Sequence, residues 1–284
     1  MKIEVHSLHW DNVNAHMLHA HKRVMHHANI PINYHHLNGV NHGKWMEAVI
    51  RQSQSDVVVF FEPDCIPLNM NFYEYVRYAH RNKTFVGIAQ VSNHIPPKSH
   101  IYAAPGFYCI SKEAYTRLGS PSFTETYRSD TAEEISYLAE EKGLKYRALM
   151  PTYFYKEPEE GLWPLGNLGY YGIGTVFDDS IFHLYQSRMA QNVDLFVDMC
   201  DMVLEGTFNT ANFQKATTFN YSGIAAWVFL TIVLVALASF GSTESLAAAF
   251  AYLILVVSIL NSGESAFKNW NSFIDTSVNT GKNK

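Results

Sequence analysis

The chain has 284 residues, of which 48% are hydrophobic and 17% charged, so it can bury a substantial core and is not a disordered polypeptide. Its formal net charge of −5 argues against a general nucleic-acid binder, because such proteins carry a basic surplus. Three cysteines, Cys65, Cys109 and Cys200, show no paired spacing, which argues against a disulfide scaffold and a cysteine zinc site.

Alternating short strands and helices are predicted for residues 1–150. We expect strands at 3–7, 32–36, 56–61, 85–90, 106–110 and 146–150, and helices at 16–28, 43–52, 71–80, 112–118 and 131–142. The segment 56–61 is apolar and β-branched after its first residue, which is typical of a strand buried in a parallel sheet. Strands separated by helices of about ten residues predict an α/β domain with a mostly parallel sheet.

The segment 152–177 differs in composition from the rest of this domain. It combines several tyrosines and Trp163 with glycines at positions 161, 166, 169, 172 and 174. Long segments of this kind are often lids or binding loops, so the segment is a candidate for closing over a substrate. An irregular surface loop with some buried aromatic rings is the alternative.

Two carboxylates follow the buried strand directly, in the sequence Glu62-Pro63-Asp64. Open α/β sheets bind ligands just beyond the carboxyl ends of their strands. Paired acidic oxygens at such a point can hold a hard divalent cation, which in turn can hold a diphosphate. A structural turn is the alternative, because Asp and Pro are both common after a strand.

The stretch from Asn41 to Leu68 resembles the core of GT-A-fold glycosyltransferases, especially the family 2-like group. Its strand 56–61 leads into Glu62 and Asp64 as that fold leads into its Asp-x-Asp motif. The resemblance implies a Rossmann-like domain over residues 1–190 that binds a nucleotide-sugar donor. It also implies Mn²⁺ or Mg²⁺ as the cofactor, with Glu62 in the first position of the motif and Asp64 in the second.

Two further stretches carry the same resemblance. The segment 104–119 is similar to the glycine-aromatic strand and short helix that line the sugar site, which assigns Gly106 to it. The segment 129–146 resembles the acidic helix start that supplies the catalytic base, with Asp130, Glu133 and Glu134 as candidates and Asp130 favoured by its distance from Gly143. A capping box formed by Asp130 and Glu133, or an exposed acidic helix face, explains the same residues without catalysis.

His183 follows the glycine-aromatic segment and stands alone among apolar residues. The resemblance implies that a late histidine completes the metal site, and a neutral imidazole is a suitable third ligand. A buried, hydrogen-bonded histidine is the alternative. The resemblance also places Asn38, Lys44 and Trp163 at the nucleotide-sugar site. Residues 35–39 depart from the family, since they lack the acid that reads the base there.

Histidines are concentrated near the N-terminus, where ten of the 14 lie between His6 and His42. Clustered histidines can bind zinc or copper. No known zinc spacing is present, so we expect a solvated, weakly basic helix face instead.

The C-terminal part of the chain has a different composition. Residues 191–215 predict a connecting helix, and residues 216–263 contain a single charge, at Glu244. Two apolar runs in the latter segment predict a transmembrane helical hairpin, followed by a polar tail at 264–284. Lysines on both sides of the hairpin place the catalytic domain at the membrane's cytoplasmic side. A buried helical pair in a soluble domain, or a swapped dimer, is the alternative.

Together these features predict a metal-dependent glycosyltransferase anchored at a membrane. It would move a sugar, with inversion, from a nucleotide-sugar donor to a hydroxyl of a glycan, lipid-linked or small-molecule acceptor. A catalytically inactive GT-A-like protein that binds or scaffolds partners at the membrane is the alternative. A nucleotidyltransferase is disfavoured, because no glycine-rich basic phosphate loop follows the first strand.

Overall fold

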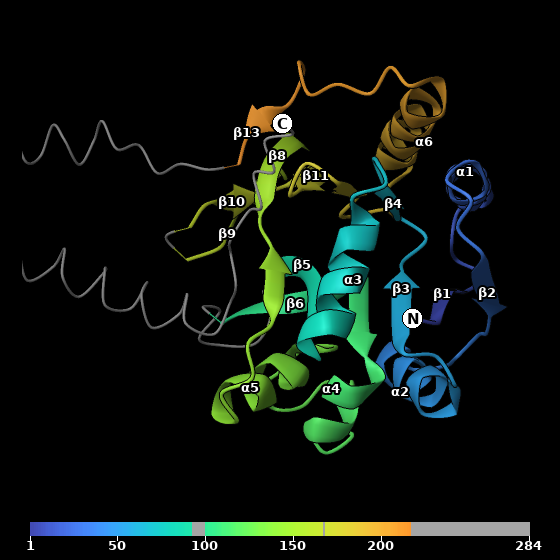
Figure 1. The fold of residues 1–284 in the computed structure, drawn as a ribbon. Coiled ribbons are helices and arrows are strands. Elements are labelled where there is room, and N and C mark those ends of the chain that lie inside the picture. The colour runs from blue at the N-terminus through green and yellow to red at the C-terminus, as the bar shows by residue number, and fades with distance from the viewer. Residues whose placement is uncertain (93–99, 167, 217–284) are drawn as a thin grey trace, which may run out of the picture. The chain divides into compact units, whose positions relative to one another are not determined.

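The computed structural model describes residues 1–92, 100–166 and 168–216 (Figure 1). A six-stranded sheet forms its centre, with the strand order β2-β1-β3-β6-β5-β7. The strands are β1 (Ile3–His9), β2 (Ile32–His36), β3 (Val57–Phe61), β5 (Phe85–Val91), β6 (Ile101–Ser111) and β7 (Arg147–Leu149). All neighbouring pairs are parallel except those of β6, which is antiparallel to β3 and β5. The predicted α/β class with a mostly parallel sheet is confirmed.

Helices connect these strands much as the sequence predicts. They are α1 (Ala15–His27), α2 (His42–Gln52), α3 (Phe72–Asn82), α4 (Lys112–Arg117) and α5 (Glu133–Glu141). The start of α2 is fixed by Asn41, whose side-chain oxygen accepts the backbone N–H of Lys44 at 3.0 Å. The predicted helix 131–142 begins two residues late, because Ala132 has a left-handed backbone with a φ of 67°.

A second, antiparallel sheet occupies the segment that we expected to be a loop. Its strand order is β13-β8-β11-β12-β4, and it consists of β4 (Cys65–Pro67), β8 (Pro151–Lys156), β11 (Ile173–Phe177), β12 (Ile181–His183) and β13 (Gln214–Lys215). The two-residue strands β9 (Trp163–Pro164) and β10 (Tyr170–Tyr171) pair beside it. The alternative of an irregular surface loop at 152–177 is therefore wrong, and closure of this segment over a substrate stays a prediction. Strand β4 was missed as well, because its partner β12 lies far along the chain.

The segment after residue 190 is packed into the same unit. Helix α6 (Ala190–Glu205) packs against α1, and β13 pairs with β8 of the second sheet. A cluster of buried apolar side chains from α1, α6, β11 and β12 joins these elements, with Met17, Val24, Val176, Phe182 and Phe196 among them. This packing carries the described unit past residue 190 as far as Ala216.

The predicted hairpin and tail lie outside the described residues, apart from Ala216. Among the helices of the described part, none combines the length and the apolar character needed to cross a bilayer.

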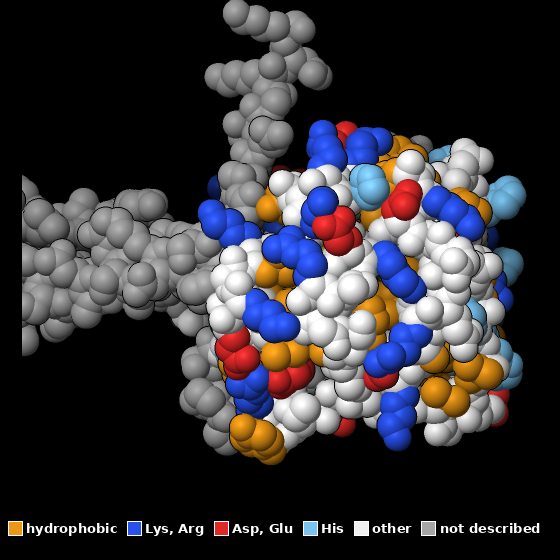
Figure 2. Space-filling model, turned by 60° about the horizontal axis from the view of Figure 1, so that its bottom comes forward, with side chains coloured by type: hydrophobic (Ala, Val, Ile, Leu, Met, Phe, Trp, Pro, Cys, Tyr) orange, Lys and Arg blue, Asp and Glu red, His pale blue; other side chains and the backbone are white. Residues whose placement is uncertain are grey.

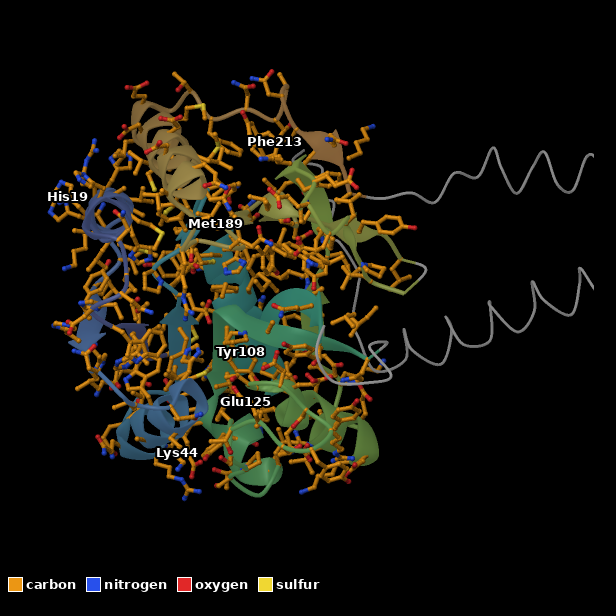
Figure 3. The ribbon with its side chains drawn as sticks, turned by 180° about the vertical axis from the view of Figure 1, so that it is seen from behind. His19, Lys44, Tyr108, Glu125, Met189 and Phe213 are labelled. Atoms are coloured by element: carbon orange, nitrogen blue, oxygen red, sulfur yellow. The ribbon has the colours of Figure 1, made fainter. Side chains whose placement is uncertain are left out.

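Most of the N-terminal histidines fall into two groups. Those facing outward from α1, such as His19 in Figure 3, are exposed, as expected for a solvated basic face. His6 and His9 on β1 instead meet His35 and His36 on β2, with 3.0 Å between the ring nitrogens of His6 and His35. Only one cluster in the described residues has the composition and spacing of a metal site, and these histidines do not belong to it.

Charged side chains are spread over the face shown in Figure 2. Lysines and arginines lie apart there, with acidic and apolar side chains between them. This distribution gives that face no continuous basic surface of the kind that tracks a nucleic-acid backbone.

Candidate functional site

The end of β3 and the end of β12 meet where the two sheets adjoin. The backbone N–H of Glu62 donates to the carbonyl of Gly106 at 2.9 Å, and a tight turn then leads through Asp64 into β4. Strand β4 pairs with β12 so that Cys65 lies opposite His183. This register brings His183 beside two carboxylates that precede it by more than a hundred residues.

Glu62, Asp64 and His183 form a compact group of potential metal ligands. One ligand atom from each lies within 4.8 Å of the others, and Nε2 of His183 is 3.6 Å from both Glu62 Oε2 and Asp64 Oδ1. Within the described residues, Asp64 Oδ1 and both ring nitrogens of His183 are buried without a hydrogen-bond partner. Buried polar atoms normally find partners, so Asp64 Oδ1 and Nε2 of His183 fit a cation held between them.

The electrostatics of this group reflect its close packing. Burial works to lower the pKa of His183, but the carboxylates of Asp64 and Glu62 raise it to about 9. Burial works to raise the pKa of Asp64, yet its interaction with His183 leaves that pKa below its usual value. The carboxyl of Asp64 is therefore ionised near neutral pH, as a metal ligand must be.

Cavities lie on both sides of this group. One, of about 270 Å³, is lined by Glu62 and Asp64 together with Trp10, Arg188 and residues at the start of α1. The other, of about 250 Å³, is lined by Glu62 and His183 together with residues of β6 and Asp130. Glu62 and His42 line both, so the candidate metal group stands between two ligand-sized spaces.

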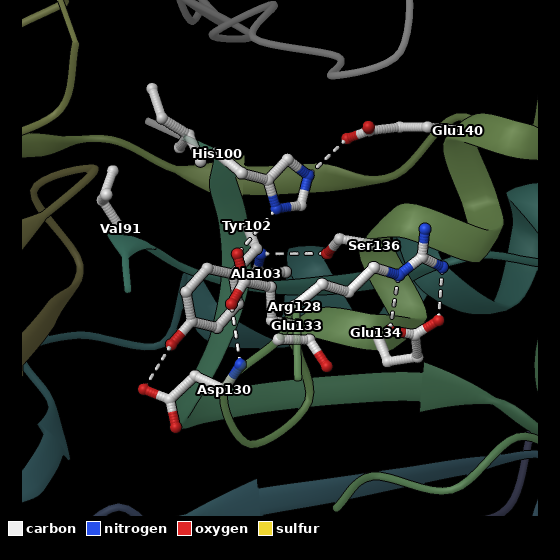
Figure 4. A network of polar contacts seen from close by, with 12 residues as sticks. Val91, His100, Tyr102, Ala103, Arg128, Asp130, Glu133, Glu134, Ser136 and Glu140 are labelled. Atoms are coloured by element: carbon white, nitrogen blue, oxygen red, sulfur yellow. Dashed lines mark hydrogen bonds and ion pairs between the residues drawn. The ribbon is translucent and has the colours of Figure 1, made fainter. Parts of the chain in front are cut away.

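Of the three predicted base candidates, only Asp130 lines a cavity that also contains the carboxylate of Glu62. The hydroxyl of Tyr102 donates to Asp130 Oδ2 at 3.5 Å. Glu133 instead contacts His100 and the backbone of Asp130, and Glu134 is paired with Arg128 (Figure 4). The expected capping box is half formed, because Glu133 accepts the Asp130 N–H while the Asp130 side chain accepts from Thr131.

The residues predicted to contact the donor are dispersed. Gly106 lines the Asp130 cavity, and Asn38 lines a third space beside Trp10 and Arg188. Lys44 is exposed on α2, and Figure 3 shows it at the far end of the domain from Met189, the neighbour of Arg188. This position does not bring Lys44 to the candidate metal group.

Trp163 is not among the residues that line these three cavities, and it contacts other aromatic rings instead. Its ring centroid is 5.3 Å from that of Tyr185, which packs edge-on against His183 at 4.3 Å. Trp163 thus supports the ring that holds the histidine in place.

Sequence reasoning missed three residues at this site. Asp11 accepts a hydrogen bond from the side chain of Asn38 at 2.5 Å and lies 2.6 Å from Nε2 of His36, so an acid stands beside the end of β2 after all. Arg188 lines two of the cavities and makes no ion pair within the part of the chain described. His42 lies 3.5 Å from Glu62. For Asp11 alone the sequence offered a signal, since it lies shortly after the first predicted strand.

Comparisons with known proteins add distant likenesses. No family model matches the chain, and no curated protein matches it. Protein A197 from STIV shares 12% identity over 40% of this chain and 66% of its own, with a TM-score of 0.30. A glycosyltransferase involved in glycosylation of the major capsid of PBCV-1 shares 11% over 42% and 66%, with a TM-score of 0.29.

A further solved structure similar to this chain is that of an enzyme. It is 4-diphosphocytidyl-2C-methyl-D-erythritol synthase from Anaerococcus prevotii, with 11% identity over 52% of this chain and 88% of its own, and a TM-score of 0.34. The chain spans just under two thirds of the length of A197 and of the PBCV-1 capsid glycosyltransferase. At these scores, any functional assignment has to come from the geometry of the site itself.

Proposed function

We propose that this protein is a metal-dependent glycosyltransferase that uses a nucleotide-sugar donor. The observation that carries the proposal is the group Glu62, Asp64 and His183 at the end of β3. Asp64 Oδ1 and the ring nitrogens of His183 are buried without a hydrogen-bond partner in the described part of the chain, and the group lines two cavities, one of which also contains Asp130. A cation site, a donor space and a candidate base therefore adjoin one another.

The three ligands suit Mn²⁺ or Mg²⁺, because carboxylate oxygens favour hard cations and an imidazole favours Mn²⁺ of the two. When bound, the cation neutralises negative charge on the diphosphate as it leaves the sugar. Arg188 lines the same two cavities as Trp10 and Asn12. Its exposed guanidinium supplies planar hydrogen-bond donors suited to phosphate.

Other residues that line the cavities would bind the donor on one side of Glu62 and activate the acceptor on the other. Asp11 and Asn38, beside the ends of β1 and β2, are suited to hold the polar edge of the donor's base or ribose. Asp130, on the other side of Glu62, would take the proton from the acceptor hydroxyl as its oxygen attacks the anomeric carbon. Attack from the side opposite the diphosphate gives inversion at that carbon.

The apolar runs between residues 217 and 263 complete the proposal as a membrane anchor, with the catalytic unit on the cytoplasmic side. An anchored enzyme of this kind would meet lipid-linked acceptors readily, although glycans and small molecules present the same hydroxyl chemistry.

The first experiment measures thermal unfolding and donor hydrolysis of the full chain with UDP-, GDP-, CMP- and dTDP-sugars, with and without Mn²⁺. We expect one donor to raise the melting temperature only with metal, and to be slowly hydrolysed. Asp64→Asn should abolish both effects. Asp179→Asn is the matched control, because Asp179 is an exposed acid on the turn between β11 and β12.

A folded chain that responds to no donor and no metal would overturn the proposal. The inactive membrane-bound scaffold would then be the better description, and Asp64 would be a turn residue.

A further inference from the structure

His100 lies between two carboxylates in a cluster outside the candidate metal group. Its Nδ1 is 2.8 Å from Glu133 Oε1, and its Nε2 is 3.0 Å from Glu140 Oε1 (Figure 4). A neutral imidazole carries one N–H and can donate to only one of these acceptors. Both contacts together with ionised carboxylates therefore require the imidazolium form.

The surroundings of His100 favour that form. Burial lowers its pKa, but the hydrogen bonds and charges of Glu133 and Glu140 raise it above the usual value. The ring of Tyr137 stacks on His100 at 3.7 Å. Tyr102 stacks on His100 at 6.5 Å, and Tyr146 donates to Glu140 at 2.7 Å. Arg128 lies over the ring of Tyr137.

Glu133 connects this cluster to the second cavity. Its side chain is almost fully buried, and while Oε1 contacts His100, Oε2 accepts the backbone N–H of Asp130 at 2.7 Å. The left-handed turn at Ala132 carries the chain off the axis of α5, so that Asp130 lies outside the helix. The Glu133 carboxylate thus links His100 to the backbone of the loop that presents Asp130.

We propose that His100 and Glu133 are positioning residues for Asp130. The protonated ring holds the Glu133 carboxylate, and that carboxylate holds the backbone of Asp130 so that its side chain stays at the cavity beside Glu62. The inference rests on the proposed function, in which Asp130 is the base. Loss of the ring proton removes one of the two contacts and leaves a buried carboxylate poorly compensated, which loosens the Asp130 loop.

Kinetics of four variants in the full chain test the proposal. His100→Gln and Glu133→Ala should lower kcat about 10- to 100-fold and leave the KM for the donor unchanged, because a small misplacement of a catalytic group has that effect. Glu133→Gln retains an oxygen for the Asp130 N–H and should restore most of the activity. Glu140→Gln is the matched control, since Glu140 contacts the other nitrogen of the His100 ring but does not touch Asp130.

Amide hydrogen exchange supplies a readout that needs no activity. After correction for the intrinsic pH dependence, the Asp130 amide of the unmodified chain should lose protection as pH rises through the pKa of His100. His100→Gln should remove that protection at every pH, whereas Glu140→Gln should retain it at low pH. The unmodified chain suffices for the pH series, so a variant that fails to fold leaves the test intact.

Different outcomes separate this inference from the proposed function. Protection of the Asp130 amide that does not vary with pH, or an unchanged kcat in His100→Gln and Glu133→Ala, would overturn the positioning role. If Asp130→Asn retains full turnover, the assignment of the base is wrong, and the exchange experiment still decides whether His100 controls the loop.

Discussion

Gly106 makes room for the imidazole of His183. A Cβ atom at position 106 would lie 3.0 Å from Cδ2 and 3.1 Å from Nε2 of that ring, and 2.6 Å from Ile88 Cδ1. The carbonyl of the same glycine accepts the N–H of Glu62. One residue of β6 therefore fixes the spacing between two candidate metal ligands that come from different sheets.

Gly106→Ala should weaken metal binding, because the added methyl group pushes the His183 ring away from Glu62 and Asp64. We expect Mn²⁺ affinity to fall about 10- to 100-fold, as when an outer contact of a metal ligand is lost. Isothermal titration of Mn²⁺ into the full chain measures this. Gly143→Ala is the control, since Gly143 has no atom near its missing Cβ; it should cost stability through its positive φ and spare metal binding. Equal affinities in the two variants would contradict this role of Gly106.

The sequence predicts the parts of the site that depend on local pattern. An apolar run ending in Glu62 and Asp64 identifies both the central strand and its functional end, because burial and strand termination are local properties. The second sheet could not be predicted, since its register joins β4 to β12 across more than a hundred residues and its glycines resemble those of a loop. The same long-range pairing decides which histidine reaches the carboxylates.

Two other differences between the predicted and the observed site also depend on contacts that the sequence pattern does not show. The acid missing after β2 is supplied by Asp11 from the end of β1, which a search along β2 alone cannot find. The choice among three acids at the start of α5 depends on their partners. Glu133 and Glu134 are occupied by His100 and Arg128, which precede them by 33 and six residues respectively.

Asp130→Asn should lower kcat about 100- to 10,000-fold, the usual contribution of a general base, while leaving donor and Mn²⁺ binding intact. Glu134→Gln breaks the pair with Arg128 at a partly exposed position, so it should change stability by at most about 1 kcal/mol and kcat very little. Steady-state kinetics and thermal unfolding of both variants make the comparison. A greater loss of kcat in Glu134→Gln would move the base to that residue.

Arg188→Met should raise the KM for the donor about 10- to 100-fold, because a charge-assisted hydrogen bond to phosphate contributes about 1.5–3 kcal/mol. The unmodified protein should also bind its donor less tightly at high salt, and the variant should show less of this dependence. Arg117→Met on α4 provides the control, as Arg117 is exposed and lines none of the three cavities around Glu62, Asp64 and Asn38. Identical donor KM values in the two variants would remove Arg188 from the donor site.

His21 predicts an acid-sensitive component of stability. His21 lies on the buried face of α1, with Nδ1 2.8 Å from the hydroxyl of Tyr34, and burial lowers its pKa to about 4. Because the folded pKa is below the unfolded value near 6.5, this contribution is fully present above pH 6.5 and is lost as pH falls toward 4. The free energy of unfolding should therefore drop by ~2 kcal/mol between pH 7 and pH 5 on account of His21.

Urea unfolding at the two pH values, with metal removed by a chelator, measures this component. His21→Gln keeps a polar partner for Tyr34 but does not titrate, so its stability should fall less between pH 7 and pH 5 than that of the unmodified chain. His19→Gln is the matched change on the exposed face of the same helix and should follow the unmodified chain. The buried ring of His21 resists protonation in the folded state, so replacing His21 should reduce the dependence of stability on pH in this range. If His21→Gln loses as much stability on acidification as His19→Gln, the acid sensitivity arises elsewhere.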